Sequence, residues 1–211
     1  MSESPNKGNM ELFIIYGIIA LVVLGIFFMR RSWQPFLNKL FTLAPNAPAT
    51  IVYDWRKVDV GNTGVSIDSP AELKPRVITL PANVKPLVEE MVTFGFTSQP
   101  LNIEVVSVLY TPQVVPNING AEQGAISNLK RLPLVKKVEY VSKQFSASGK
   151  KGILLDGTFE ALRNKMGFKG VILIEGSNMW QVVTIYKFSD KQAVEAVQRI
   201  IDSIKIEKKT S

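Results

Sequence analysis

An uninterrupted apolar run near the start of the chain constrains its fold more than any other feature. The run extends from Leu12 to Met29 and holds 18 residues without a charge. At a rise of about 1.5 Å per residue, an α-helix of this length spans roughly 27 Å, close to the hydrocarbon thickness of a bilayer. The sequence therefore predicts a transmembrane helix over residues 12–31, preceded by a short, polar and disordered tail over residues 1–11.

The end of the run favours a retained anchor over a cleaved signal peptide. Signal peptides have an apolar core of about 7 to 15 residues, followed by small residues at a cleavage site. Here the run is longer and ends in Phe27-Phe28-Met29-Arg30-Arg31. We therefore expect a membrane anchor. The side chains that we expect to hold it in the bilayer and at its surfaces are Leu12, Tyr16, Met29, Arg30, Arg31 and Trp33.

The charges on the two sides of the anchor predict its orientation. Lys7 is the one basic residue before it, whereas Arg30, Arg31 and Lys39 follow it closely. Cytoplasmic flanks carry the excess of Lys and Arg. This bias predicts a single-pass membrane protein whose soluble domain is cytoplasmic, and the alternative is an extracytoplasmic domain.

A second apolar pattern follows the anchor. From Trp33 to Leu43 the apolar residues recur at helical spacing, which indicates either an amphipathic helix in the headgroup region or a continuation of the spanning helix. Pro45 and Pro48 then break the helix. We assign residues 32–50 to a juxtamembrane helix and a proline-containing linker.

Composition excludes several kinds of chemistry. The chain has 211 residues and contains neither Cys nor His, which removes disulfides, Cys nucleophiles, His-based triads and the usual zinc sites. The net charge of +7 suits anionic headgroups or acidic protein surfaces. We expect a protein that is not an enzyme, holds no cofactor or metal, and contacts membrane lipid and other membrane-complex subunits rather than nucleic acid.

Residues 51–207 have the pattern of a domain in which strands outnumber helices, followed by a tail over residues 208–211. A hairpin is predicted over residues 58–67, a β-branched strand over residues 101–110, and a helix over residues 119–132 capped by Asn119. Residues 81–100 fit either helix or strand. Four successive strands form a predicted antiparallel meander: Val138 to Ser146, Ile153 to Ala161, Val171 to Glu175 and Met179 to Phe188.

The final helix begins at a predicted capping box, in which Ser189 caps the helix and Gln192 reaches back. Its predicted apolar face comprises Ala193, Val194, Val197, Ile200, Ile201 and Ile204. In the strand before it, Trp180, Tyr186 and Phe188 share an alternating face and are expected in the core.

From about Trp55 to Glu207 this layout resembles the PsbP-like fold, which is also the α/β sandwich of the DcrB lipoproteins. The matching pieces are a strand ended by proline at Val65-Ser66-Ile67-Asp68-Ser69-Pro70, the helix after Tyr110, the meander strand from Trp180 to Tyr186, and the closing helix that ends in Ile200-Ile201-Asp202-Ser203-Ile204-Lys205. The expected fold class is thus α+β, an antiparallel meander packed with helices behind one transmembrane helix. The resemblance implies an accessory, binding or assembly role, an extracytoplasmic location and no catalytic residues.

Three polar groups are candidate sites. Gly149-Lys150-Lys151-Gly152 lacks the spacing of a phosphate loop and is interpreted as a hairpin turn. Asp156 and Glu160 share a strand face, and exposed strand charges are the common case for such a pair. A basic cluster is either a solvated face or a contact for anionic lipid or an acidic partner; its members are Lys130, Arg131, Lys136, Lys137, Lys143, Lys150 and Lys151.

These patterns support one functional hypothesis and one alternative. The first is a non-enzymatic, membrane-anchored accessory or assembly subunit of a larger membrane protein complex, acting by protein binding. The alternative is a membrane-tethered module that binds a small molecule or lipid.

Overall fold

The computed structural model describes residues 53–98, 100–132, 134–161 and 164–207. Among these residues, no helix is long and apolar enough to cross a membrane. The predicted tails, transmembrane helix, juxtamembrane helix and linker lie outside the described residues, so they stay predictions.

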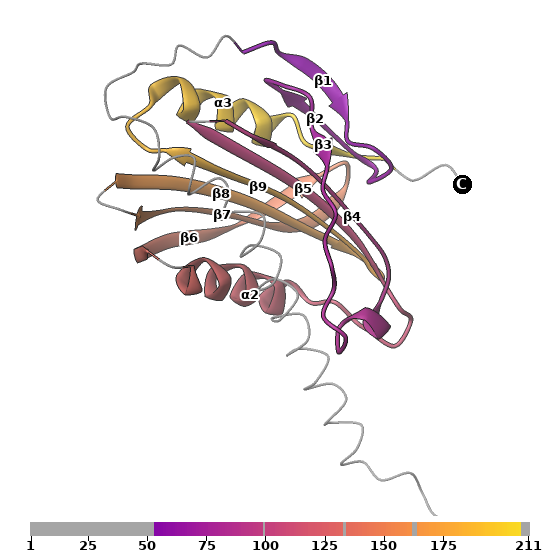
Figure 1. Ribbon diagram of the computed structural model, residues 1–211. Helices are drawn as coiled ribbons and strands as arrows, with labels where there is room; N and C mark the ends of the chain where they lie inside the picture. The colour runs from indigo at the N-terminus through magenta and orange to yellow at the C-terminus, as the bar shows by residue number, and fades with distance from the viewer. Residues whose placement is uncertain (1–52, 99, 133, 162–163, 208–211) are drawn as a thin grey trace, which may run out of the picture.

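Two antiparallel sheets and two α-helices make up the described chain, which confirms the predicted α+β class (Figure 1). The large sheet has seven strands in the order β3-β4-β5-β9-β8-β7-β6, and the small one has the order β1-β2-β10. The strands of the large sheet are β3 (Lys74–Pro75), β4 (Val88–Thr97), β5 (Leu101–Tyr110), β6 (Val135–Ala147), β7 (Lys150–Ala161), β8 (Asn164–Glu175) and β9 (Asn178–Lys187). Those of the small sheet are β1 (Arg56–Asp59), β2 (Val65–Ser69) and β10 (Lys205–Ile206).

Strand β5 lies where the β-branched pattern predicts it, with the same bounds. The ambiguous stretch before it folds into a short 3-10 helix, η1 (Lys85–Leu87), and then β4. Pairing of β4 with β5 along nearly its whole length decides the conformation of this stretch, because the long-range ladder satisfies backbone groups that a local helix would satisfy otherwise.

The predicted meander is confirmed, and its first three strands are longer than the sequence pattern indicates. Strands β6, β7, β8 and β9 pair in succession. The turn between β6 and β7 is formed by Ser148 and Gly149, with φ angles of 50° and 77°, the positive pair that a tight hairpin turn requires. Lys150 is already paired with Ala147, so the hairpin prediction is correct but its turn begins one residue before Gly149.

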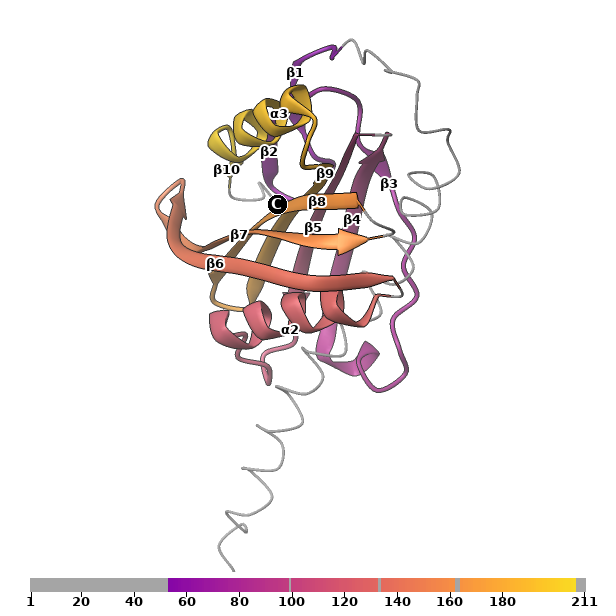
Figure 2. The same cartoon turned by 90° about the vertical axis from the view of Figure 1, so that its left-hand side faces the viewer.

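The two helices cover opposite faces of the large sheet. Helix α2 (Ile118–Arg131) packs over β6, β7 and β8, and α3 (Lys191–Asp202) packs with the small sheet on the other face (Figure 2). Alternate residues of β9 show this division. Val183 and Ile185 join the α2 core, whereas Val182 and Tyr186 join the α3 core.

The predicted N-caps of both helices need correction. Asn117, not Asn119, caps α2 by accepting a hydrogen bond from the Gly120 N–H at 2.7 Å. Asp190, not Ser189, caps α3 by accepting from the Ala193 N–H at 3.0 Å, so the predicted capping box does not form. The cap of α2 lies two residues before the predicted one and the cap of α3 one residue after it, so a different side chain occupies each capping position.

Two apolar side chains predicted in the core are partly exposed. Trp180 and Tyr186 are buried as expected, but Phe188 lies beyond the end of β9 and is 44% exposed. Its ring is covered by the Lys165 ammonium, 4.7 Å from the ring centroid. Val194 is 38% exposed, because it lies at the margin of the apolar face of α3.

Candidate functional site

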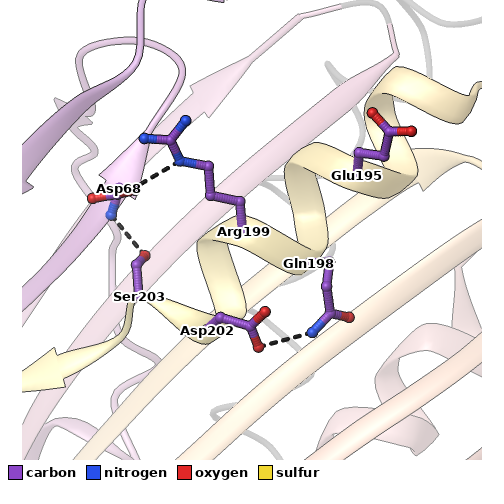
Figure 3. A pocket seen from close by; sticks show the side chains of 6 residues that line it. All are labelled: Asp68, Glu195, Gln198, Arg199, Asp202 and Ser203. Atoms are coloured by element: carbon purple, nitrogen blue, oxygen red, sulfur yellow. Dashed lines mark hydrogen bonds and ion pairs between the residues drawn. The ribbon is translucent and has the colours of Figure 1, made fainter.

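An open hollow of about 490 Å³ lies where the outer side of α3 meets β2. Figure 3 shows its lining, which is made of charged and polar side chains: Asp68, Glu195, Gln198, Arg199, Asp202 and Ser203. Residues 195, 198, 199 and 202 are spaced by three and four along the helix, so they form one exposed stripe. The opposite stripe of α3 is buried against the sheet, which fixes the helix and directs the polar stripe toward the hollow.

Asp68 joins the two elements that form the hollow. Its carboxylate accepts from the Arg199 Nε at 3.0 Å, and its backbone N–H donates to the Ser203 Oγ at 2.7 Å. The Ser203 hydroxyl in turn donates to the Ile200 carbonyl at 2.8 Å. The Asp68–Arg199 ion pair is partly exposed, so its contribution to stability is small. Its effect is to hold the guanidinium in one orientation.

Arg199 also stacks on an aromatic ring. Its guanidinium carbon lies 4.2 Å from the centroid of the half-buried Trp55 ring. Tyr53 meets Trp55 edge to face, with ring centroids 5.7 Å apart. Burial, and to a smaller degree the nearby Asp190 carboxylate, raise the pKa of Tyr53. The Tyr53, Trp55 and Arg199 side chains thus form an aromatic and cationic group beside the hollow.

A polar network supports the other side of the hollow. The Gln198 amide donates to Asp202 at 2.8 Å and accepts from the Lys169 ammonium at 2.9 Å. Lys169 also pairs with Asp156 at 3.1 Å. Among the described residues, Glu195 has no hydrogen-bond or ion-pair partner, so it is the carboxylate available to a binding group.

The structure separates the residues of the predicted basic cluster. Lys130 and Arg131 end α2, and Lys136 and Lys137 begin β6. Lys150 and Lys151 begin the next strand, β7, and pair with Ala147 and Ser146 at the far end of β6. Lys136 and Ser146 are ten positions apart along β6, which corresponds to about 33 Å of extended strand. Lys143 is exposed on β6 between these groups, so the predicted cluster is spread along the strand rather than gathered in one patch.

The six lysines and arginines proposed to contact an anionic surface also differ in their exposure and in their ion pairs. Lys150 is 8% exposed, pairs with Glu175 at 2.7 Å and lies 5.6 Å from the Trp180 ring centroid. Lys137 is exposed and pairs with Glu160 at 2.7 Å, and this hydrogen bond raises the pKa of Lys137. The other four are exposed: Lys130, Arg131, Lys136 and Lys151. Contact with an anionic surface stays a prediction for this set.

The remaining predicted sites are the carboxylate pair on β7 and the residues of the membrane anchor. Asp156 and Glu160 share the face of β7 turned away from α2, and each has its own lysine partner. In the described part of the chain, no three Asp or Glu side chains gather in a way that could hold a metal ion. The anchor residues Leu12, Tyr16, Met29, Arg30, Arg31 and Trp33 lie outside the described residues.

Comparison with known proteins supports the fold assignment alone. No protein-family model and no curated protein matches the sequence. Among solved structures, the fold resembles PsbP (CyanoP) from Synechocystis sp. PCC 6803, with a TM-score of 0.49 and 10% identity over 78% of this chain and 98% of that one. It also resembles LpqN of Mycobacterium tuberculosis, a protein involved in cell envelope biogenesis, with a TM-score of 0.47 and 14% identity over 78% of this chain and 100% of that one.

The predicted PsbP-like resemblance is thus confirmed at the level of the fold. Sequence reasoning did not find the residues around the hollow, because Asp68 and Arg199 are 131 positions apart. One signal was present in the sequence. Glu195, Arg199 and Asp202 recur at helical spacing opposite the apolar face of the final helix, which marks a charged stripe but not its partner.

Proposed function

We propose that this protein is a non-enzymatic, membrane-anchored accessory or assembly subunit of a larger membrane protein complex, and that it acts by binding another protein at the α3 hollow. The observation that supports this proposal is the stack of Arg199 on Trp55, which Asp68 holds in place at the edge of an open hollow. Tryptophan and arginine are the residues most enriched at the energetic centres of protein interfaces. A side chain already held in one orientation loses less entropy on binding.

The chemistry of the lining indicates what the partner presents there. Glu195 lacks a partner among the described residues, and Asp202 carries a second carboxylate on the same stripe. A lysine or arginine side chain of the partner suits this side of the hollow, with an apolar group against Trp55. Small-molecule sites are mostly enclosed, whereas this hollow is open, which is why protein binding ranks before the small-molecule or lipid alternative.

The membrane anchor in this proposal rests on the apolar run over residues 12–31, and the cytoplasmic placement rests on Arg30 and Arg31. Membrane lipid is accordingly a proposed partner of the chain. The extracytoplasmic placement implied by the PsbP-like resemblance is the alternative.

The test is a native size analysis of the full chain extracted from its source membrane in mild detergent. We expect the protein to migrate in an assembly larger than one or two of its own 23.4 kDa chains. Glu195→Lys should release it from that assembly, because it places a cation where the partner's cation binds. Glu89→Lys, at an exposed site on β4, is the matched control and should leave the assembly intact. Migration of the wild-type chain as a monomer or homodimer would refute the proposal.

A further inference from the structure

Strand β6 presents a long free edge. Within the described residues it pairs with β7 on one side and has no strand on the other, and Figure 2 shows it along the near edge of the sheet above α2. Every residue from Glu139 to Gln144 is exposed, including Tyr140 at 39% and Val141 at 53%. An edge of this kind offers backbone N–H and C=O groups to any strand that fits beside it.

The beginning of β6 is protected against such pairing, and the middle is not. The ladder with β7 is irregular between Lys136 and Glu139, where Lys137 has a φ of 50°. A bulge with lysines at a sheet edge is a common device against pairing with other strands. From Glu139 to Ala147 the register with β7 is continuous, so a regular edge is available over this stretch.

The side chains of this stretch are complementary to themselves about Val141. Glu139 and Lys143 lie two residues to either side of Val141 and on the same face of the strand. A second copy placed antiparallel about a two-fold axis at Val141 sets each Glu139 opposite a Lys143 of the other copy. Val141 then lies opposite its own equivalent. Opposite charges and β-branched side chains are both favourable cross-strand neighbours.

Other two-fold registers lack this match. A centre at Tyr140 sets Glu139 against Val141 and Lys143 against the irregular start of the strand, and a centre at Lys143 or Glu139 sets like charges directly opposite each other. A centre at Ser142 sets Lys143 against Val141 and leaves both charges without an opposing charge. Because like charges directly opposite are destabilising, the pattern selects the register centred on Val141.

We propose that two copies of this chain associate by antiparallel pairing of β6 with β6, about a two-fold axis at Val141, so that the two seven-stranded sheets become one continuous sheet. This interface is separate from the α3 hollow and does not depend on the function proposed for it. The regular edge is short, so the association is weak and cross-linking is the suitable measurement. The competing occupant is an acidic extended segment of another protein, attracted by Lys136, Lys143 and Lys151.

The natural chain contains no cysteine, so a single introduced cysteine reports the interface directly. In an antiparallel pair, directly opposite Cα atoms lie about 4.5 or 5.5 Å apart, within the range that a disulfide bridges. The full chain carrying Val141→Cys, in mild detergent under mild oxidation, should form a disulfide-linked dimer that a reducing agent dissolves. Val77→Cys and Val115→Cys, at 94% and 83% exposed sites away from β6, are the controls for random collision. Val141→Cys cross-linking no better than these controls would overturn the proposal.

Changing the charges at Glu139 and Lys143 tests the register. It also distinguishes a second copy of the chain from an acidic segment of another protein. In the Val141→Cys background, Glu139→Lys or Lys143→Glu alone should lower the cross-linked fraction about tenfold, because each sets like charges opposite each other twice. A mixture of the two single variants should restore cross-linking between them, because every opposing pair is then of opposite sign. If the mixture stays as weak as the single variants, the self-pairing is wrong, and the edge belongs to a different strand. Both changed residues are exposed, and an unaltered melting temperature of each variant confirms that it is folded.

Discussion

Burial distinguishes two arginine–carboxylate pairs that the sequence alone would treat alike. Arg76 lies 3.4 Å from the Glu104 carboxylate on the central strand β5 and donates to Thr97 at 2.6 Å. Glu104 is 3% exposed. Arg56 and Asp54 are closer, at 2.7 Å, but more than half of each side chain is exposed. A carboxylate that is buried depends on its partner far more than one in water does.

We therefore expect Arg76→Met to lower the free energy of unfolding by about 3 kcal/mol, because it leaves the buried Glu104 without its guanidinium. The matched change Arg56→Met should cost less than about 1 kcal/mol, because water solvates Asp54 in place of the lost partner. Denaturant unfolding of the full chain in detergent, followed by tryptophan fluorescence, measures both. Equal losses in the two variants would contradict the assignment of a buried pair.

A buried tyrosine makes stability depend on alkaline pH. Burial, with a smaller contribution from Asp156, raises the pKa of Tyr186 from 10.0 to about 12. Between these pH values the unfolded chain releases the phenolic proton and the folded chain retains it. Stability contributed by this group is therefore complete below pH 10 and is lost as the pH rises toward 12.

Tyr186→Phe removes this titration, so the variant should lose less stability than the parent between pH 10 and pH 12. Tyr140→Phe, at an exposed position on β6, is the control and should follow the parent curve. Melting temperatures at a series of alkaline pH values provide the measurement. A variant curve that falls as steeply as the parent curve would show that other groups carry the alkaline sensitivity.

Sequence patterns predicted correctly those helices and strands whose conformation depends on residues close together in the chain. The β-branched run of β5 and the apolar stripe of α2 gave the correct elements, because those patterns fit one secondary structure and one buried face. Residues 88–97 could not be assigned, because only the partner strand β5 decides between helix and strand there. The basic cluster was contiguous along the chain, but an extended strand carries its two halves to opposite ends.

The assignment of Asp190 as the N-cap of α3 can be tested by measuring stability. Asp190 accepts from the Ala193 N–H, and its neighbour Ser189 is exposed and makes no such bond. Asp190→Ala should therefore destabilise the protein by about 1 kcal/mol, the usual cost of a lost N-cap. Ser189→Ala should change stability by less than about 0.5 kcal/mol. If Ser189→Ala lowered the melting temperature more than Asp190→Ala, Ser189 would be the cap, as the predicted capping box requires.

The α3 hollow and the outer edge of β6 carry different charges, so different partners are proposed for them. The α3 hollow carries the carboxylates of Glu195 and Asp202 and suits a cationic group. Strand β6 is the last strand of the large sheet, and its outer edge suits a second copy of the chain. A heteromeric contact and a self-association can thus coexist, because neither uses the residues of the other.

The side of the membrane on which these surfaces operate is the last prediction. Arg30 and Arg31 directly after the apolar run predict that the domain is cytoplasmic, whereas the PsbP-like resemblance implies the opposite side. A tag at the C-terminus of the full chain should therefore be labelled by an impermeant reagent only after the cells are permeabilised. Replacing both arginines by glutamine should weaken this orientation, since it removes two of the three basic residues that closely follow the run, leaving Lys39. Labelling of the wild-type tag in intact cells would show that the domain is extracytoplasmic and that the charge bias does not set the topology.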